Sequence, residues 1–458
     1  MYTLNPHSKV PLYLQLYDEM KYEIINHLHV GGKLPSIRKI SQEYQISKNT
    51  VESAFSQLYA EGYIESKNKS GYFVSDINLL DLHVKGTLTQ IEASAQTDYI
   101  YDFYPARLSQ DTFPIKLWKR LFNKVMDRSL DFGAYPNGQG ELGLREQIAK
   151  YLIDSRGVKC SANQVILSGS FMDSMGLVAR LFKPESTGFA IEHPGYHVAR
   201  RVFESYNYEI SKIGVDANGL KIQELENSEA KLVYITPSHQ YPTGVAMPIA
   251  NRLRLLQWAN ANDAFIIEDD YDSEMSYKNR PIPCLQGLDH DERVIYIGTF
   301  SKSLSPALRV SYMVLPLRFI DTYKGMVDYY FPRVSLSTQK TLELFMKEGH
   351  WERHLRKVRH SNRKKHDIMK ESLQSILGES MKIVSEGGGL AILIQPICKL
   401  DFEKLKVKTE EAKLKIYFAK ERSGGEFEAL RMGFGGFKEN EIPYAVQAFA
   451  KVWFECID

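Results

Sequence analysis

The stretch GTFSKSLSPALRVSY, residues 298–312, places one lysine between two serines and an arginine seven positions later (309 − 302 = 7). The apolar run VIYI, residues 294–297, directly precedes it, and such a run predicts a buried strand. Lys302 therefore follows the carboxyl end of a strand, which is where α/β folds bind their ligands. We expect this lysine to belong to a ligand site.

The same alternation continues on both sides of this stretch. Apolar runs such as QVILSGS (164–170), KLVYITPS (231–238) and AFIIEDDYD (264–272) alternate with helical patterns such as RLRLLQWANAND (252–263). Strands that are apolar throughout, alternating with helices, predict an α/β domain with a mainly parallel sheet. The candidate site residues stand at the carboxyl ends of its strands, within residues 168–171, 237–244, 268–272 and 299–302.

The composition is that of a globular protein. The chain has 458 residues, of which 43% are hydrophobic and 25% charged, so two or three domains are expected. The formal net charge of +2 neither favours nor excludes a polyanionic partner. The four cysteines stand far apart without a CxxC pair, which argues against a metal site or a disulfide framework. No apolar leader and no run of membrane-spanning length is visible, so we expect a cytoplasmic location.

The first 75 residues follow a different pattern, with three short helices before a hairpin. Apolar residues recur every four positions from Leu12 to Ile24, and the glycines at positions 31 and 32 are expected to end that helix. Ser36 is the expected N-cap of a second helix, and a third opens at Ser47. The segments YIES and YFV, separated by KNKSG, predict the two strands of a β-wing.

Three helices followed by a wing predict a winged helix-turn-helix, whose recognition helix presents its first turn to the major groove of DNA. Arg38, from the preceding helix, is expected to reach a phosphate or a base edge. The candidate DNA contacts are Ser36, Arg38, Lys48, Asn49, Thr50, Lys67 and Lys69. Small helical units also serve as protein-docking modules, and acidic and basic residues nearly balance here, so charge alone does not decide between the two.

The candidates in the α/β domain have defined roles if the ligand is pyridoxal 5′-phosphate (PLP). Lys302 would form an imine with the aldehyde, which requires an amine whose pKa is lowered by burial. Asp269 would pair with the protonated pyridine nitrogen, and Tyr271 would hydrogen-bond the phenolic oxygen. Tyr196 would stack on the ring face.

The phosphate of such a ligand would rest on backbone N–H groups where a helix opens after residue 169, and on hydroxyl groups and a guanidinium further along. The residues expected there are Ser170, Phe171, Thr299, Ser301 and Arg309. Taken singly, each of these motifs is more often a surface loop, a solvated strand end or a turn. Their order, with Asp269 and Lys302 at strand ends 33 residues apart (302 − 269 = 33), favours one shared site.

From about Tyr101 to Asp458 the chain resembles the fold-type I PLP-dependent aminotransferases. The landmarks YPNGQGELGLREQIAKYL, SRGVKCSANQVILSGS, PSHQYPTG, EDDYDSE and TFSKSLSPALRVSY occur in that family's order. The segment LPSIRKISQEYQISKNTVESAF resembles the GntR-type DNA-binding domain. Together the two parts are similar to the MocR/GabR-like transcriptional regulators.

The resemblance implies an organisation and a function. The implied segments are a GntR-type winged helix at 1–75, a linker at 76–98, a large PLP-binding domain at 99–334 and a smaller C-terminal α/β domain at 335–458. The implied assembly is a homodimer, arranged head to tail, in which Tyr135 reaches the phosphate held by the partner. Arg431 stands where such proteins bind the carboxylate of a substrate or effector. The implied function is a PLP-dependent, DNA-binding regulator that senses PLP or an amino compound.

Three departures from the family patterns bear on activity. Tyr241, expected to face the cofactor, stands where aminotransferases carry an asparagine that holds the phenolic oxygen of PLP. Phe171, Met172 and Asp173 occupy a segment where small or amide residues are common. Lys48 replaces the usual arginine of the DNA-binding domain, which removes a bidentate contact. We expect inefficient catalysis at most. A true aminotransferase and an empty dimerisation scaffold are the alternatives, separable by turnover and by bound cofactor.

Overall fold

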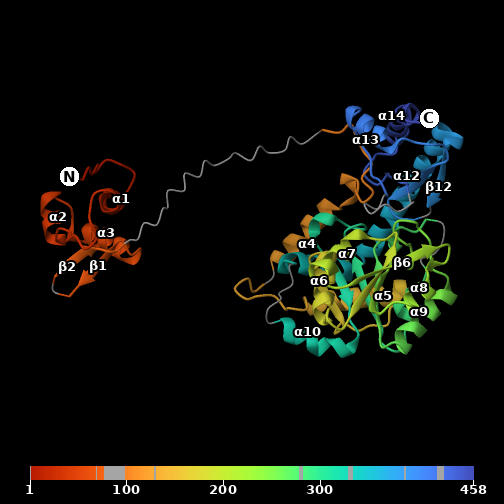
Figure 1. Ribbon diagram of the computed structural model, residues 1–458, viewed down its shortest axis with the longest axis horizontal. Coiled ribbons are helices and arrows are strands. Elements are labelled where there is room, and N and C mark those ends of the chain that lie inside the picture. The colour runs from red at the N-terminus through yellow and green to blue at the C-terminus, as the bar shows by residue number, and fades with distance from the viewer. Residues whose placement is uncertain are drawn as a thin grey trace. The chain divides into compact units, whose positions relative to one another are not determined.

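The computed structural model describes residues 2–68, 70–76, 98–127, 130–277, 282–327, 334–385, 388–419 and 428–457 (Figure 1). The chain forms two compact units, Met1–Ala95 and Gln96–Asp458. Two expectations fall outside the described residues: the contact of Lys69 with DNA, and the linker apart from its ends at residues 76 and 98. No helix in the described ranges is long and apolar enough to cross a membrane.

The first unit is a winged helix-turn-helix, as the sequence predicted. Its elements are α1 (Leu12–Asn26), α2 (Ile37–Glu43), α3 (Lys48–Ala60), β1 (Ile64–Lys67) and β2 (Gly71–Val74). Each helix buries one apolar face, and these faces share a core with Ile64 and Val74 of the antiparallel hairpin. Ser36 and Ser47 cap α2 and α3, where each hydroxyl accepts a hydrogen bond from a backbone N–H group of the first turn.

The first helix ends earlier than we predicted. α1 stops at Asn26, and the glycines that follow it do not cap it. Gly31 N–H donates to the carbonyl of Val74, and the carbonyl of Gly32 accepts from Val74 N–H, both at 2.9 Å. The backbone groups of both glycines are hydrogen-bonded to Val74 of β2, so the glycines lie along the edge of the wing.

The second unit is built on an eight-stranded sheet in the order β4-β11-β10-β9-β8-β5-β6-β7. Its strands are β4 (Val165–Ser168), β5 (Gly188–His193), β6 (Ile210–Asp216), β7 (Gly219–Leu220), β8 (Ala230–Ile235), β9 (Phe265–Asp270), β10 (Val294–Thr299) and β11 (Ser311–Val314). Strands β5, β6, β8, β9 and β10 run parallel, whereas the pairs β10-β11, β11-β4 and β6-β7 are antiparallel. The predicted, mainly parallel sheet is confirmed.

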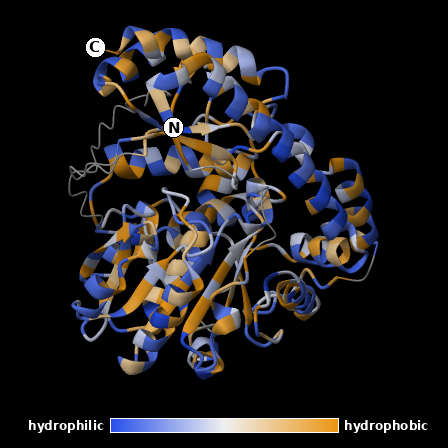
Figure 2. Cartoon of the chain, turned by 90° about the vertical axis from the view of Figure 1, so that its right-hand side faces the viewer, coloured by the Kyte–Doolittle hydropathy of each residue, from blue (hydrophilic) through white to orange (hydrophobic). Residues whose placement is uncertain are grey.

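Helices cover both faces of this sheet, which is mostly hydrophobic (Figure 2). The helices are α4 (Ile115–Met126), α5 (Leu142–Arg156), α6 (Phe171–Leu181), α7 (His197–Ser205), α8 (Ile222–Glu226), α9 (Ile249–Ala261), α10 (Ile320–Val327) and α11 (Leu336–Lys347). On β10, Ile295 and Ile297 pack with α6, α7 and α10, whereas Tyr296 packs in the core of α4, α5 and α11. This alternation follows from the two-residue period of a strand. We call the sheet and these helices the large lobe.

A small lobe follows in the same unit. Its antiparallel sheet consists of β12 (Met381–Ser385), β13 (Ala391–Pro396) and β15 (Leu430–Gly433), and its helices are α12 (His350–Leu377), α13 (Phe402–Glu411) and α14 (Ile442–Glu455). β3 (Tyr101–Asp102) pairs in parallel with β14 (Leu414–Lys415), and Phe103 lies in the small-lobe core. The chain therefore enters the second unit through the small lobe, although we had placed these residues in the large domain.

The longest helix belongs to both lobes. Trp351 and Leu355, in the first turns of α12, lie in the core of the large lobe, whereas Met369 and Leu373 lie in the core of the small lobe. α11 also packs in the large lobe. The two cores thus meet along α12, and the domain boundary expected at residue 335 stays a prediction.

An ion pair between Arg156 and Asp270 fixes the end of β9 to α5. Arg156 Nε lies 2.7 Å from Asp270 Oδ2, and the two side chains are 3% and 1% exposed. Arg156→Met leaves a buried carboxylate without its cation, so we expect the free energy of unfolding to fall by about 3–5 kcal/mol. The double variant Arg156→Met, Asp270→Asn should recover part of that loss.

Urea unfolding followed by tryptophan fluorescence measures this effect, since all four tryptophans belong to the second unit. A single variant as stable as the wild type would contradict the assigned role of the ion pair.

Candidate functional site

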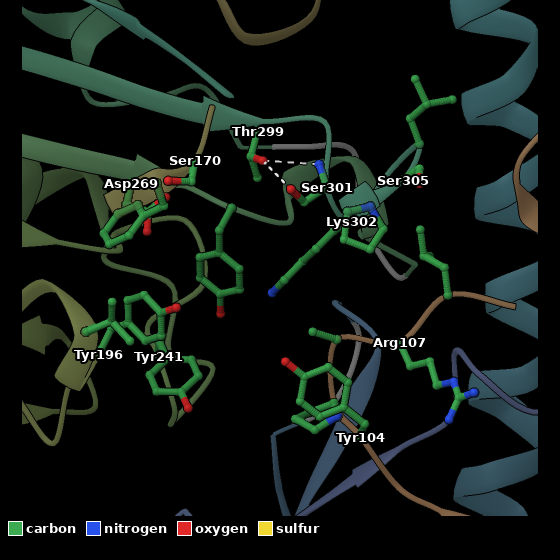
Figure 3. Close-up of a pocket in the computed structure, with 18 of the residues that line it drawn as sticks. Tyr104, Arg107, Ser170, Tyr196, Tyr241, Asp269, Thr299, Ser301, Lys302 and Ser305 are labelled. Carbon is green, nitrogen blue, oxygen red and sulfur yellow. Dashed lines mark hydrogen bonds between the residues drawn. The ribbon is translucent and has the colours of Figure 1, made fainter. Parts of the chain in front are cut away.

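A cavity of about 1100 Å³ opens at the carboxyl ends of β4, β8, β9 and β10 (Figure 3). The small lobe contributes Tyr417, Phe418 and Arg431 to its wall, and most of the segment 102–113 lines it as well. The predicted site residues that line it are Ser170, Phe171, Tyr196, Tyr241, Asp269, Tyr271, Thr299, Ser301, Lys302, Arg309 and Arg431. Tyr135 does not line the cavity, and its side chain is 82% exposed.

The end of β9 brings four acidic side chains into the interior. They are Glu268, Asp269, Asp270 and Asp272, all less than a tenth exposed. Because a buried carboxylate is costly unless it is paired or hydrogen-bonded, each of the four needs a partner.

The protein itself provides partners for the two acids that face away from the cavity. Glu268 accepts from the backbone N–H groups of residues 285 and 286 at 2.7 and 2.8 Å. Asp270 pairs with Arg156 and also accepts from the hydroxyl of Tyr296 at 2.5 Å. Both carboxylates are thereby tied to the framework around β9.

Asp272 has a partner from another loop. His239 Nδ1 donates to Asp272 Oδ2 at 2.8 Å. Burial alone would raise the pKa of Asp272, but His239 and this hydrogen bond keep it below its usual value. The hydroxyl of Tyr271 donates to the carbonyl of His239 at 3.0 Å, so its expected bond to a ligand oxygen stays a prediction.

Asp269 is different from the other three. Its one hydrogen bond among the described residues comes from the hydroxyl of Tyr234 at 2.6 Å, and it lines the cavity. Burial raises the pKa of Asp269 to about 7, against the opposing effects of Tyr234 and Lys302. A ligand with a cationic N–H group would complete the pairing of acids at this strand end.

The amine of Lys302 projects into the cavity (Figure 3). Its Nζ lies 3.9 Å from the centre of the Tyr271 ring. Burial lowers the pKa of Lys302 to about 8, with Asp272 and Asp269 acting to raise it and Arg431 acting to lower it further. Near neutral pH the uncharged form is still the minor one, but it is far more populated than in an exposed lysine, which gives the cavity a nucleophile.

Hydroxyl groups and a helix start form a polar cup in the cavity (Figure 3). Thr299 Oγ1 donates to Ser301 Oγ at 3.0 Å and accepts from the hydroxyl of Ser311 at 3.0 Å. Ser170 caps α6, and Phe171, the first residue of that helix, lines the same cavity. Backbone N–H groups at a helix start, together with hydroxyls, suit an anion such as phosphate.

Two residues near the cup remain unassigned to a ligand contact. Arg309 is exposed at the rim, and its Nη1 lies 3.5 Å from the carbonyl of Pro306, so its contact with a phosphate stays a prediction. Asp173 donates its backbone N–H to Ser170 Oγ at 3.2 Å as part of the α6 cap. Asp173 therefore contributes to the cap of α6 through its backbone N–H group.

Arg431 reaches the cavity from the small lobe and contacts Tyr241 of the large lobe. Arg431 Nη1 donates to the hydroxyl of Tyr241 at 2.8 Å, and its guanidinium carbon lies 4.5 Å from the ring centre. The Tyr241 ring also packs edge-on against Tyr196, with centroids 5.2 Å apart. The tyrosine that replaces the family's asparagine thus orients an arginine of the other lobe.

Sequence analysis missed several cavity residues. Tyr234 lies within an apolar strand, and no spacing marks it. Tyr104 lies across the cavity from Asp269, and Arg107 turns its guanidinium away from Lys302 (Figure 3). These two residues belong to the segment that enters from the small lobe, and no local pattern signals that position.

The candidate DNA contacts lie on the first unit and differ in whether their side chains already take part in caps or ion pairs. The exposed ones at the starts of α2 and α3 are Arg38, Lys48 and Asn49. The side chains of Ser36 and Thr50 take part in helix caps. Lys67 pairs with Glu65 at 3.0 Å, so a contact with DNA would compete with that pair. Their contacts with DNA stay predictions.

Two family patterns match the chain. The family described as bacterial regulatory proteins, gntR family, matches residues 12–74. The family described as aminotransferase class I and II matches residues 107–449. The first match covers the winged helix, and the second covers most of both lobes.

Curated relatives and solved structures agree with these matches. The chain is 39% identical to the HTH-type transcriptional regulator YdeL of Bacillus subtilis over 98% of each chain. It is 31% identical to the probable rhizopine catabolism regulatory protein MocR of Rhizobium meliloti, over 88% of this chain and 86% of that one. Kynurenine aminotransferase of Pyrococcus horikoshii, solved with PMP, superposes with a TM-score of 0.71 at 24% identity, over 79% of this chain and 92% of that one. At that identity the superposition shows the fold alone.

The reactivity of Lys302 should depend on pH in a characteristic way. We expect its acylation in the cofactor-free protein to accelerate as the pH rises through about 8, because burial favours the neutral amine. Asp272→Asn removes a charge that favours the ammonium form, so the profile should move to lower pH. Arg431→Met removes a repelling charge, so it should move to higher pH.

Peptide mass spectrometry measures the rates, with the exposed Lys116 as an internal reference in the same digest. A profile for Lys302 that coincides with that of the reference lysine would exclude the proposed effect of burial.

Proposed function

The chain belongs to the HTH-type transcriptional regulators that join a GntR-type DNA-binding domain to an aminotransferase class I and II domain, and on that premise we propose that it binds PLP at Lys302 and senses a small amino compound in the same cavity. The sensed molecule is an amine that reacts with the bound cofactor, or PLP itself. When a ligand occupies the cavity, the affinity of the DNA-binding unit for its operator changes.

The proposal rests on how Asp269 differs from the three acids beside it. Its three acidic neighbours have a cation, a histidine or backbone N–H groups, whereas Asp269 has one tyrosine hydroxyl and lines the cavity. A protonated pyridine nitrogen is the cationic N–H donor that this carboxylate lacks. The ion pair would keep Asp269 ionised at a pH where burial otherwise favours its neutral form.

The residues around Asp269 suit the rest of the cofactor. When bound, PLP supplies an aldehyde and an electron sink. Burial lowers the pKa of Lys302 to about 8, so a larger fraction of its amine is neutral and able to react with the aldehyde than in an exposed lysine. Thr299, Ser301 and the start of α6 at Ser170 offer hydroxyl and backbone N–H donors to the phosphate. One set of side chains thus fits three chemically different parts of one molecule.

The cavity has room for a second molecule beside the cofactor. Ligand pockets usually hold about 300–1000 Å³, and this one has a volume of about 1100 Å³. Arg431 lies in the part contributed by the small lobe, and a guanidinium binds a carboxylate through two parallel hydrogen bonds. We propose an amino acid-like effector, with its amine at the cofactor and its carboxylate at Arg431.

An active aminotransferase is the alternative function. Tyr241 argues against efficient turnover, because its hydroxyl already accepts from Arg431 and it replaces the asparagine that aminotransferases place against the cofactor. Sustained turnover above about 1 per second with an amino donor and a keto acid would favour the enzyme over the sensor.

Regulation of transcription requires DNA and, in this proposal, two copies of the chain. Arg38, Lys48 and Asn49 are exposed where a winged helix contacts the major groove. Tyr135 is 82% exposed and outside its own cavity, which is consistent with a head-to-tail homodimer in which it reaches the phosphate bound by the partner.

PLP uptake tests the cofactor assignment. Wild-type protein incubated with PLP should gain a visible absorption band, because conjugation with the Lys302 nitrogen shifts the absorbance of the ring. Asp269→Asn should bind PLP about 10- to 150-fold more weakly, the effect of losing one hydrogen bond to a charged group. Lys116→Ala, at an exposed lysine, serves as the control and should behave as wild type.

Lys302→Ala should lack the band. If it keeps an unchanged band after borohydride treatment and dialysis, the lysine has been assigned wrongly.

Coupling between the cavity and DNA tests the sensor assignment. An effector carboxylate bound to Arg431 should draw the small lobe toward Lys302. Linkage requires that a ligand which changes operator affinity has its own affinity changed by the same factor, commonly about 5- to 150-fold. We would titrate amino acids into the PLP-loaded protein with and without a DNA duplex recovered by selection from a random pool.

Arg431→Ala should abolish coupling for carboxylated ligands, and Arg431→Lys should retain part of it. Equal ligand affinities with and without DNA would refute coupling. Undiminished coupling in Arg431→Ala would instead indicate a ligand without a carboxylate, or PLP occupancy, as the signal.

A further inference from the structure

The long helix α12 (Figure 1) carries basic residues whose side chains do not line the cavity. Between Arg353 and His366 the sequence RHLRKVRHSNRKKH contains no acidic residue. The exposed side chains on one face are Arg356, Lys357, His360, Arg363 and Lys364. At 100° per residue they fall within roughly 120° of the helix circumference. We call these five residues the α12 stripe.

The opposite face of the helix explains why the stripe points outward. Trp351, Leu355, Met369 and Leu373 bury that face in the cores of the two lobes. Two other basic residues of α12 have structural partners: Arg359 donates to a carbonyl of the loop after β9, and the buried Lys365 donates to the carbonyl of Gly435. The stripe is therefore the part of the helix that packing leaves in solvent.

Two exposed acidic residues of α12 flank the stripe, Glu352 before it and Asp367 after it, and Asp367 lies 3.0 Å from His366. Among the side chains in the described ranges, none of the five stripe residues forms an ion pair. By contrast, three glutamates of α13 flank Lys404, Lys406 and Lys408, and Lys408 pairs with Glu455 at 2.7 Å. The four arginine and lysine side chains of the stripe carry positive charge with no ion-pair partner among the described residues, so an anionic partner would stabilise it.

The spacing of the stripe fits a regular polyanion. From Arg356 to Lys364 the helix rises roughly 12 Å, which matches about three successive phosphates along one strand of B-DNA. Arginine and lysine are the side chains that most often contact the phosphate backbone. The chain already carries a DNA-binding unit, so duplex DNA is the polyanion that the assembled protein meets.

We propose that the α12 stripe binds the phosphate backbone of duplex DNA flanking the sequence read by the winged helix. This inference rests on DNA binding by the first unit and does not depend on PLP or on an effector. The contact is independent of sequence, because it involves phosphates rather than base edges. The second unit thereby adds affinity for long DNA, and the first unit supplies specificity.

Two duplexes separate this contact from recognition by the winged helix. One contains only the core sequence that the full-length protein selects from a random pool, and the other has ~30 base pairs of unrelated DNA on each side. Neutralising the stripe with Arg356→Gln, Lys357→Gln, Arg363→Gln and Lys364→Gln should weaken binding to the long duplex about tenfold. The magnitude of its logarithmic salt slope should fall by ~0.9 for each phosphate that the variant no longer neutralises. Binding to the short duplex should not change.

A matched variant controls for net charge. Its substitutions are Lys404→Gln, Lys406→Gln, Lys438→Gln and Lys451→Gln, at exposed lysines of the small lobe. It changes the charge by the same four units and should bind both duplexes as the wild type does. Arg38→Ala should weaken binding to both duplexes, since it acts on the first unit.

The outcomes are distinguishable. Equal weakening by the stripe variant and the matched variant would overturn the proposal, as would a loss of dimers in light scattering, which would make the stripe a subunit interface. If the wild type binds neither duplex, DNA binding by the first unit fails as well. If the stripe variant does not fold, as judged by tryptophan fluorescence, hydroxyl-radical footprinting of the wild type decides: protected flanks support the contact and unprotected flanks exclude it.

Discussion

Four carboxylates have to be buried at the end of one strand, and much of the second unit is arranged around that requirement. Asp270 holds α5 against the sheet through Arg156, and Glu268 holds the loop at residues 285 and 286. Asp272 brings in His239 from the loop after β8. Each partner comes from a different segment, so these contacts tie three parts of the second unit to the end of β9. Asp269 is the one of these four acids that lines the cavity, and its side chain accepts a hydrogen bond from Tyr234.

The second determinant of the site is a contact between the lobes. The hydroxyl of Tyr241 accepts from Arg431, so the guanidinium is oriented before any ligand arrives. A carboxylate that binds there has to share Arg431 with the tyrosine or displace it. Tyr241 thus gives the two lobes a polar connection at the site.

Local sequence patterns predicted the elements and the residues that stand at their ends. Lys302 and Asp269 could be found because each follows an apolar run, and a parallel sheet collects such positions at one edge. Patterns could not reveal contacts set by long-range packing. The glycine at position 31 looked like a helix terminator, but its N–H belongs to Val74 of the wing. Tyr234 resembles an ordinary strand residue, and only the fold places its hydroxyl on Asp269. Sequence patterns also gave no sign that α12 is buried in two cores at once, and the boundary expected at residue 335 stays a prediction.

The pairing of β3 with β14 has a mechanical consequence. Tyr101 and Asp102 are hydrogen-bonded into the small lobe, and Phe103 is buried in its core beside the strand that carries Arg431. Lys302 belongs to the other lobe. The segment that leads from the DNA-binding unit is therefore tethered to the lobe that holds Arg431, not to the lobe that holds the lysine. Residues 100–103 therefore move with the small lobe whenever it rotates. The connection consists of backbone hydrogen bonds, such as the one that Ile100 N–H donates to the carbonyl of Lys413, and it needs no relay of side chains.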